Sequence, residues 1–483
     1  MYQGASVGMK EQSSVSLGII LGVVFLSMTL GMLSVLMPWK FAIALALVPF
    51  FVLIAWNYPE VATGILVALL FGMIPDSILP KVSVGGGRLT AEDLGMLLFL
   101  LLLLLKNLSF HTNRFQPYVI PLISLLGIAF ISSVVAFLYK TAPIKDVLTE
   151  SRAYFTWIML PILFLAIDNE ARRERFKYII FAIGILSALA VIIQSFTGFS
   201  LFSKGQEVRA LWTMGSATAS VLRSTTPAMF IMSAVLIYLL ASYSLGQIKN
   251  GLFFMTSCLI LTGGILVGFG RGLWLSVIVG FFLISLFTRG SGYNRLLTTF
   301  MVLTLILISS LMIFKPDYLM AISDRFTSIT SEAEHGESFG RRTVENSYAI
   351  SKVAESPILG VGLGGHYKPA GPESLFWESE TRYIHNSYVN VLTKIGFPGL
   401  LAMLWLVLRM QKRAWHVFRH TSVEKPLALS AFWILITTTI FTSITQPNLV
   451  APNGIISIII AVFLVETISK KASHKSNLNY FNE

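Results

Sequence analysis

Apolar runs of roughly 20 residues recur along the whole chain, and a helix of this length crosses the hydrocarbon core of a bilayer. The candidate spans are 15–37, 41–56, 61–74, 94–106, 117–138, 153–168, 176–196, 226–245, 251–269, 272–288, 296–314, 386–408, 427–446 and 454–468. Because several are short, we expect about twelve to fourteen transmembrane helices. Lipid cannot satisfy backbone polar groups, so the predicted fold class is an all-α polytopic membrane protein with one large outer loop.

The composition agrees with this class. Hydrophobic residues make up 55% of the 483 residues and charged residues only 12%, whereas soluble domains carry roughly 25% charged residues. The single cysteine, Cys258, excludes a disulfide framework and a cysteine-based metal site. The net charge of +12 favours membrane lipids with anionic head groups as partners, and nucleic acid is not expected.

The densest clusters of lysine and arginine predict the orientation of the chain in the membrane. These clusters lie at 172–177, 409–425 and 470–475, and basic loops are usually cytoplasmic. The first apolar run, 15–37, exceeds the core of a signal peptide, so we interpret it as a retained span. Both termini are therefore predicted to be cytoplasmic.

The polar segment 315–384 separates the spans unevenly and is predicted to lie on the outer side. A connection this long is usually functional or disordered, and its aromatic residues favour an ordered, functional loop. An amphipathic helix is expected at about 342–355, ended by Pro357. We divide the chain into amino-terminal membrane helices (1–225), a core that includes the outer loop (226–410), and carboxy-terminal helices with a cytoplasmic tail (411–483).

Several classes of function are disfavoured. The spans carry few carboxylates, which counts against a cation-coupled carrier, and no P-loop is present, which counts against an ATPase. His416 and His420 are spaced four apart but lie in a basic inner loop, so we expect no metal site and no cofactor. The glycines of 360–365 match a dinucleotide motif only literally, because no strand precedes them. They predict a tight turn.

Arg271 is the only charge within the apolar stretch 251–288, and glycines flank it on both sides. This pattern predicts a helical hairpin with Arg271 at the outer membrane face. A charge placed there is costly and is often functional. The alternative is that Arg271 marks the turn and reaches the lipid head groups.

Further arginines fall on the predicted outer side. A guanidinium group binds phosphate oxygens with two hydrogen bonds, so together they suit an anionic cleft. Solvated charge is the alternative, particularly for Arg341. These candidates for substrate binding are Arg88, Arg152, Arg209, Arg223, Arg325, Arg341 and Arg342.

The stretch 384–404 begins where the outer loop re-enters the membrane. His385 is a candidate general base there, and Asn386 is a candidate cap for the following helix. Gly396 and Gly399 favour tight helix packing. The alternative for His385 is a helix-end histidine that only packs or forms hydrogen bonds.

In this order, the motifs resemble the bacterial O-antigen ligase and O-antigen polymerase superfamily. They are G-R-G-x-W at 270–274, R-F at 325–326, an arginine before P-I-L-G-V-G-L-G, and H-N-S-Y at 385–388 followed by G-F-P-G. The resemblance covers roughly residues 225–410. It departs from the family at Gly270, where many relatives carry serine, and the Arg341–Arg342 pair leaves the loop arginine open by one position.

The resemblance implies a metal-independent glycosyltransferase of the bacterial inner membrane. The donor would be a glycan on a polyprenyl diphosphate such as undecaprenyl diphosphate, and the acceptor a hydroxyl of the lipid A core of lipopolysaccharide, of another lipid-linked unit or of a protein. By resemblance, Arg271 and Arg342 would bind the diphosphate and His385 would assist the acceptor. A polymerase, a lipid-linked glycan transporter and a structural scaffold remain alternatives.

Overall fold

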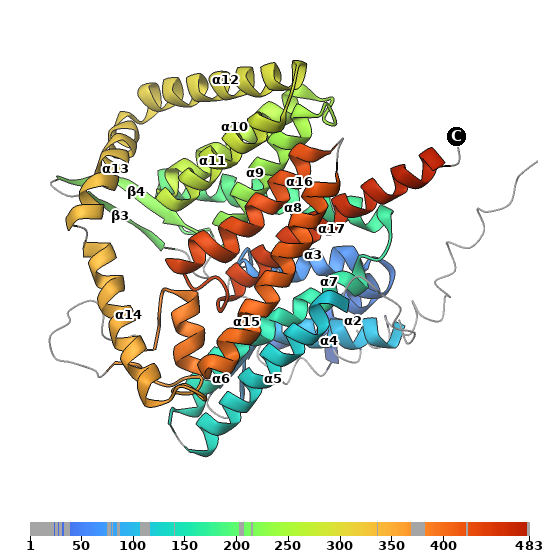
Figure 1. Cartoon of the computed structure of the whole chain (residues 1–483), viewed down its shortest axis with the longest axis vertical. Coiled ribbons are helices and arrows are strands. Elements are labelled where there is room, and N and C mark those ends of the chain that lie inside the picture. The colour runs from blue at the N-terminus through green and yellow to red at the C-terminus, as the bar shows by residue number, and fades with distance from the viewer. Residues whose placement is uncertain are drawn as a thin grey trace, which may run out of the picture.

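Helices make up almost all of the regular structure, which confirms the predicted all-α class (Figure 1). The computed structural model describes residues 24, 28, 31–32, 39–74, 79, 81–84, 87–106, 116–139, 141–201, 207–213, 216–335, 337–368, 382–421 and 424–480. The candidate span 15–37 falls largely outside them.

The helices in chain order are α2 Trp39–Asn57, α3 Pro59–Leu70, α4 Ala91–Lys106, α5 Gln116–Leu138, α6 Ile144–Phe155, α7 Met159–Ala166, α8 Glu170–Thr197, α9 Met229–Ser244, α10 Gly251–Val267, α11 Arg271–Phe287, α12 Ser291–Phe314, α13 Pro316–His335, α14 Glu337–Glu355, α15 Ser387–His420, α16 Lys425–Ile436 and α17 Pro452–Tyr480. A 3-10 turn, Thr156–Ile158, joins α6 to α7, and a π-helical turn, Thr437–Phe441, and a 3-10 turn, Thr442–Ile444, follow α16.

Within the described residues, six helices are long and apolar enough to cross a membrane, which makes the chain a multi-pass membrane protein. They are Gln116–Leu138, Glu170–Thr197, Ser291–Phe314, Ser387–His420, Lys425–Ile444 and Pro452–Ser469. Five shorter apolar helices lie at Leu45–Asn57, Pro59–Leu70, Met229–Ser244, Gly251–Val267 and Arg271–Phe287. The finer count of spans stays a prediction.

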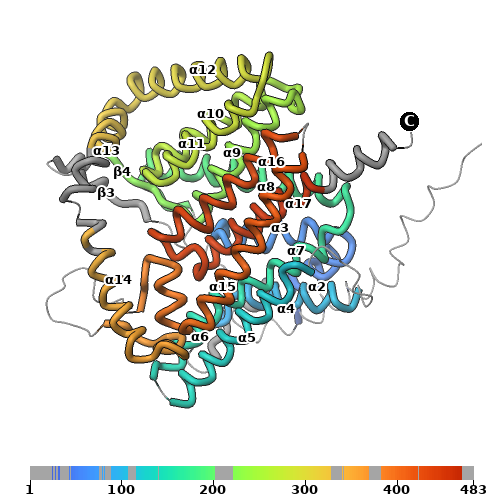
Figure 2. Tube along the Cα trace, in the orientation of Figure 1, coloured from blue at the N-terminus to red at the C-terminus, as the bar shows by residue number. Residues whose placement is uncertain are grey.

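The carboxy-terminal helices occupy the middle of the molecule. Helices α15 to α17 lie between the group α2 to α7 and the group α9 to α12, and the chain trace shows the same order (Figures 1 and 2). Helices α13 and α14 run along one side from the end of α12 toward the start of α15. Most of the described residues of the segment 315–384 are therefore helical.

The predicted amphipathic helix at 342–355 is confirmed as the larger part of α14, which ends ahead of Pro357. The segment 315–384 was predicted to be an ordered loop, and the structure describes only part of it. Helix α13 precedes α14, and the described chain continues through the glycine-rich turn to residue 368. Residues 369–381 lie outside the described residues.

Two antiparallel hairpins were not predicted. Strands β1 Lys81–Val84 and β2 Gly87–Thr90 form one, and β3 Glu207–Thr213 and β4 Ser216–Thr225 form the other. Each strand contains valine or threonine, β-branched residues that favour extended backbone. Neither hairpin is uniformly apolar, so neither stands out among the long apolar runs of the sequence.

The predicted tight turn at 360–365 is confirmed, and it packs on a kink in α15. Gly360, Gly362 and Gly364 have positive φ angles, and the N–H groups of Val361 and Gly362 donate to carbonyl groups of α15 just before the kink. At the kink, Gly396 has φ 70° and ψ −173°. This backbone conformation is essentially restricted to glycine.

A buried ion pair locks this turn to α6. The ammonium group of Lys394, on a side chain only 1% exposed, lies 2.8 Å from the Glu150 carboxylate and donates to the carbonyl of Gly365 at 2.6 Å. The second Glu150 oxygen accepts the N–H of Gly364. The turn, α6 and the first turns of α15 are therefore joined by hydrogen bonds into one unit.

Candidate functional site

The start of α15 carries His385, and a carboxylate from α14 holds it. Nδ1 of His385 lies 2.8 Å from Oε2 of Glu345, and the backbone N–H of His385 donates to Oε1 of the same carboxylate. The Glu345 side chain is 5% exposed, whereas that of His385 is 35% exposed. A carboxylate at Nδ1 favours the tautomer with the proton on that nitrogen, which leaves Nε2 as the proton acceptor.

Two neighbours further fix this histidine. The ring of Tyr383 meets the His385 ring edge-on, with centroids 4.7 Å apart. The predicted cap is confirmed, since Oδ1 of Asn386 accepts the N–H groups of Tyr388 at 3.0 Å and Val389 at 3.2 Å. The Oδ1 atom of Asn386 is thus occupied by the helix cap. The role of Asn386 in substrate binding stays a prediction.

Arg342 belongs to the same part of α14. It precedes Glu345 by three residues, so the two side chains lie on one face of the helix, and it is half-buried. The phenol of Tyr367 packs nearby among buried residues, and burial, followed by the negative charge of Glu345, raises its pKa well above the ordinary value. We call Arg342, Glu345 and His385 the histidine cluster.

The predicted hairpin at Arg271 is confirmed. Helix α10 ends at Val267, and α11 begins at Arg271 itself. Phe269 between them has a φ of 50°. No side chain caps the start of α11 at Gly270, where a serine would supply a cap. Helix amino termini bind anions, since their first N–H groups have no partner within the helix.

Two further predicted arginines belong to this corner. Nε of Arg223, in β4, donates to the carbonyl of Gly268 at 3.4 Å. Arg325 precedes Phe326 in α13, and the ring of Phe326 lies 5.0 Å from that of Trp274, one turn after Arg271. We call Arg223, Arg271 and Arg325 the turn cluster.

One tyrosine of α13 holds the turn cluster together. The hydroxyl of Tyr318 donates to the carbonyl of Ser195 at 2.6 Å and accepts the N–H of Leu222 at 3.3 Å. Its ring lies 6.0 Å from that of Phe269. Helix α13 is thereby attached to both β4 and the turn before α11.

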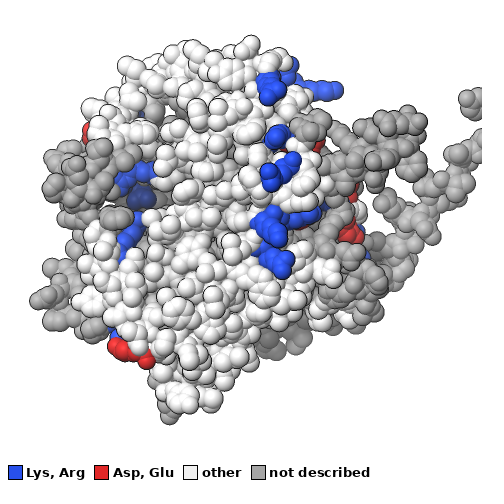
Figure 3. All heavy atoms as spheres, viewed as in Figure 1, with Lys and Arg blue, Asp and Glu red and all other residues white. Residues whose placement is uncertain are grey.

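A hollow in the surface opens beside these elements. Figure 3 shows Lys and Arg side chains around it, near the β3–β4 hairpin and α14, while much of the surrounding face is uncharged. Helix α13 connects the two clusters along this side (Figure 1). The arrangement suits an anionic group at the turn cluster and a proton acceptor at the histidine cluster.

Arg152 has a different environment. Its guanidinium group donates to Asp93 at 2.8 Å, to the Thr90 hydroxyl at 2.7 Å and to Glu92. The two carboxylates are 3% and 1% exposed. Arg152 therefore neutralises buried carboxylates of α4, and its predicted role in substrate binding has no support from these contacts.

For the remaining predicted arginines, the structure describes only the position of the backbone. Arg88 lies in β2 opposite Ser83, and Arg209 lies in β3 opposite Arg223. Arg341 lies in α14. Their side chains lie outside the described part of the structure, so their predicted roles stay predictions.

Sequence reasoning missed Glu345. The only signal was an acid on the same face of the predicted helix as Arg342, and Glu345 precedes its partner His385 by 40 residues. Among the described residues, no group of three or more His, Cys, Asp or Glu side chains could hold a metal ion.

Part of the chain is similar to a known protein family. Residues 256–404 match the family model described as O-Antigen ligase. This stretch includes Arg271, Arg325, Arg342, Glu345 and His385. No curated protein matches the chain.

Proposed function

We propose that the chain, whose residues 256–404 match the O-Antigen ligase family model, is a glycosyltransferase of the bacterial inner membrane. The donor is a glycan on a polyprenyl diphosphate, and the acceptor is a hydroxyl group on the outer side, in the lipid A core or in another acceptor. The basic clusters of the sequence support a cytoplasmic location for both termini. The family match supports a function in the assembly of lipopolysaccharide, as ligase or polymerase.

The observation that carries the proposal is the contact between Glu345 and His385. A carboxylate that fixes the tautomer of a partly exposed imidazole is the arrangement of a general base. A transporter of lipid-linked glycans or a structural scaffold has no need of it. Transporters also usually contain repeats related by symmetry, and the chain shows no convincing repeat.

The chemistry requires one proton acceptor and one anion site. Nε2 of His385 takes the proton of the acceptor hydroxyl while its oxygen forms a bond to the anomeric carbon. The bond from that carbon to the diphosphate oxygen breaks, and the electron pair leaves with the polyprenyl diphosphate. Arg271 and Arg342 stabilise the growing negative charge.

The start of α11 strengthens this assignment. Arg271 is its first residue, and no side chain caps the helix there. A diphosphate oxygen can therefore accept hydrogen bonds from backbone N–H groups at the start of the helix as well as from the guanidinium group. Fixed donors of this kind stabilise the leaving group without a metal ion.

Glycan profiling of a deletion strain tests the proposal. The strain is complemented with the wild-type chain or with His385→Ala. Accumulation of long lipid-linked chains that only wild type transfers indicates a ligase, whereas single repeat units in place of long chains indicate a polymerase. Unchanged glycans would remove the transferase assignment and favour the transporter.

A further inference from the structure

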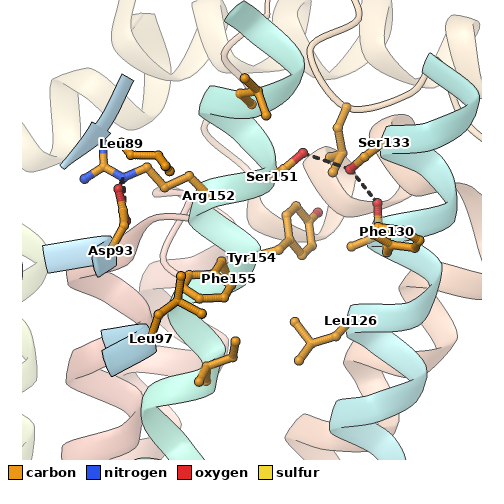
Figure 4. Close-up of a pocket in the computed structure, with 14 residues that line it drawn as sticks. Leu89, Asp93, Leu97, Leu126, Phe130, Ser133, Ser151, Arg152, Tyr154 and Phe155 are labelled. Atoms are coloured by element: carbon orange, nitrogen blue, oxygen red, sulfur yellow. Dashed lines mark hydrogen bonds and ion pairs between the residues drawn. The ribbon is translucent and has the colours of Figure 1, made fainter. Parts of the chain in front are cut away.

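A cavity of about 470 Å³ lies between α4, α5 and α6, apart from the two clusters. Among the side chains that line it are Leu97, Leu126, Phe130 and Phe155 (Figure 4). Its lining is therefore mainly hydrocarbon, although it contains a small number of polar groups. Pockets for small molecules have this general character.

One of those polar groups has no partner. Tyr154 is 3% exposed, and its hydroxyl makes no hydrogen bond within the part of the chain that the structure describes. Figure 4 shows the hydroxyl pointing from α6 into the space toward α5. Buried hydroxyl groups are nearly always hydrogen-bonded, so this one indicates a ligand that supplies an acceptor.

The other polar groups of the lining are satisfied. The hydroxyls of Ser133 and Ser151 lie 2.8 Å apart, so one can donate to the other, and each also lies within hydrogen-bond distance of a backbone carbonyl of its own helix. Arg152 and Asp93, the charged side chains of the lining, are paired with each other. The lining therefore has no unpaired positive charge that would attract an anion. The Tyr154 hydroxyl still needs a hydrogen-bond acceptor, and a neutral one suffices.

The cavity reaches the lipid-facing surface. Three of its lining residues are exposed apolar side chains, namely Leu97, Phe130 and Leu148. Phe130 lies in α5, one of the helices long enough to span a membrane. A hydrocarbon chain can therefore enter sideways from the bilayer.

The volume limits what can enter. A methylene group occupies about the volume of a water molecule, about 30 Å³, so the cavity holds roughly 15 carbon atoms. That is the length of one fatty-acyl chain. A long polyprenyl chain would fill it several times over, and it carries no neutral carbonyl for Tyr154.

We propose that this cavity binds one acyl chain of a bilayer glycerophospholipid, with an ester carbonyl accepting a hydrogen bond from Tyr154. The bound chain also packs against Leu363 of the glycine-rich turn. The next residue, Gly364, donates to Glu150 of α6. The lipid therefore supports the unit of turn, α6 and α15 that lies behind His385, and the proposal stands whether or not the chain transfers glycans.

Photolabelling of the full chain in nanodiscs tests this. The discs contain phosphatidylethanolamine and phosphatidylglycerol with a trace of a phosphatidylethanolamine that carries a diazirine in its acyl chain. Labelling is expected within 126–133 and 148–158. Ala129→Trp fills the cavity and lowers this labelling at least about tenfold, whereas Leu305→Trp, on an exposed face of α12, leaves it unchanged.

Tyr154→Phe keeps the ring and removes only the hydroxyl. Labelling at low probe concentration falls about fivefold, the effect of one neutral hydrogen bond. If residues 126–133 and 148–158 are still labelled in Ala129→Trp, the probe reaches them from the surrounding bilayer and not from the cavity. That result overturns the proposal. Equal labelling in Tyr154→Phe overturns the role of the hydroxyl, and stronger labelling by a diazirine polyprenyl phosphate overturns the choice of an acyl lipid.

Discussion

The Glu345 carboxylate binds His385 at two points, through Nδ1 of the ring at 2.8 Å and through the backbone N–H. One buried side chain of α14 thus sets both the position of the amino end of α15 and the orientation of its imidazole. Such a contact lets a histidine act as a base in one defined geometry, because the ring can neither flip nor change tautomer without losing a hydrogen bond.

Glu345→Gln is expected to lower the rate of glycan transfer about 10²-fold, with little change in KM. The amide keeps the size of the side chain but loses the negative charge that stabilises the imidazolium formed during transfer. Initial rates with purified protein and a lipid-linked donor measure this.

Glu355→Gln is the matched control for that change. Glu355 lies on the same helix, is 64% exposed and pairs only with Lys352 in the described structure. It should transfer at the wild-type rate. If Glu345→Gln also transfers at that rate and melts at the same temperature, Glu345 does not position a catalytic base.

Arg342→Ala should lower the rate of transfer about 10²–10³-fold, the usual loss when one fixed donor to a developing anion is removed. Arg342→Lys should recover only part of it, because an ammonium group cannot make two parallel hydrogen bonds. Lys352→Ala removes a partly exposed charge from the same helix and should leave the rate of transfer unchanged. Full activity of Arg342→Ala would shift the role toward Arg341, the adjacent candidate.

Gly396→Ala should destabilise the protein by about 3 kcal/mol or more. Its φ is positive, and a Cβ would lie 2.0 Å from the backbone oxygen of Ile358 in the segment before the glycine-rich turn. Gly127→Ala, in α5, meets no atom within 4 Å and should be neutral or slightly stabilising. Thermal unfolding in detergent compares the two, and equal melting temperatures would contradict the tight packing of the kink.

Arg152→Ala should lower stability by about 3 kcal/mol, because it leaves the buried carboxylates of Glu92 and Asp93 without their cation. A substrate-binding arginine would instead raise KM in a protein of normal stability. Measuring both the melting temperature and KM separates the two roles. A normal melting temperature with a raised KM would instead support the predicted role of Arg152 in substrate binding.

The helical class, the break at Arg271, the helix that contains 342–355 and the cap at Asn386 could all be predicted, because each depends on residues close together in the chain. Apolar runs become helices wherever backbone groups must pair internally, and glycine, proline and asparagine mark ends by their own conformations. The hairpins that place Arg88, Arg209 and Arg223 were missed, since short strands are stabilised mainly by what they pack against.

The amino-acid sequence by itself determined which residue types stand at the ends of the apolar helices and in the segment 315–384, and these included Arg271, His385 and Arg342. Only the tertiary structure decided which of them meet and what they meet. Glu345 reaches His385 across 40 residues, whereas Arg152, a similar lone arginine in the sequence, is paired with buried carboxylates. The reason is physical: the environment of a charge depends on its neighbours in space, and packing brings those neighbours from distant parts of the chain.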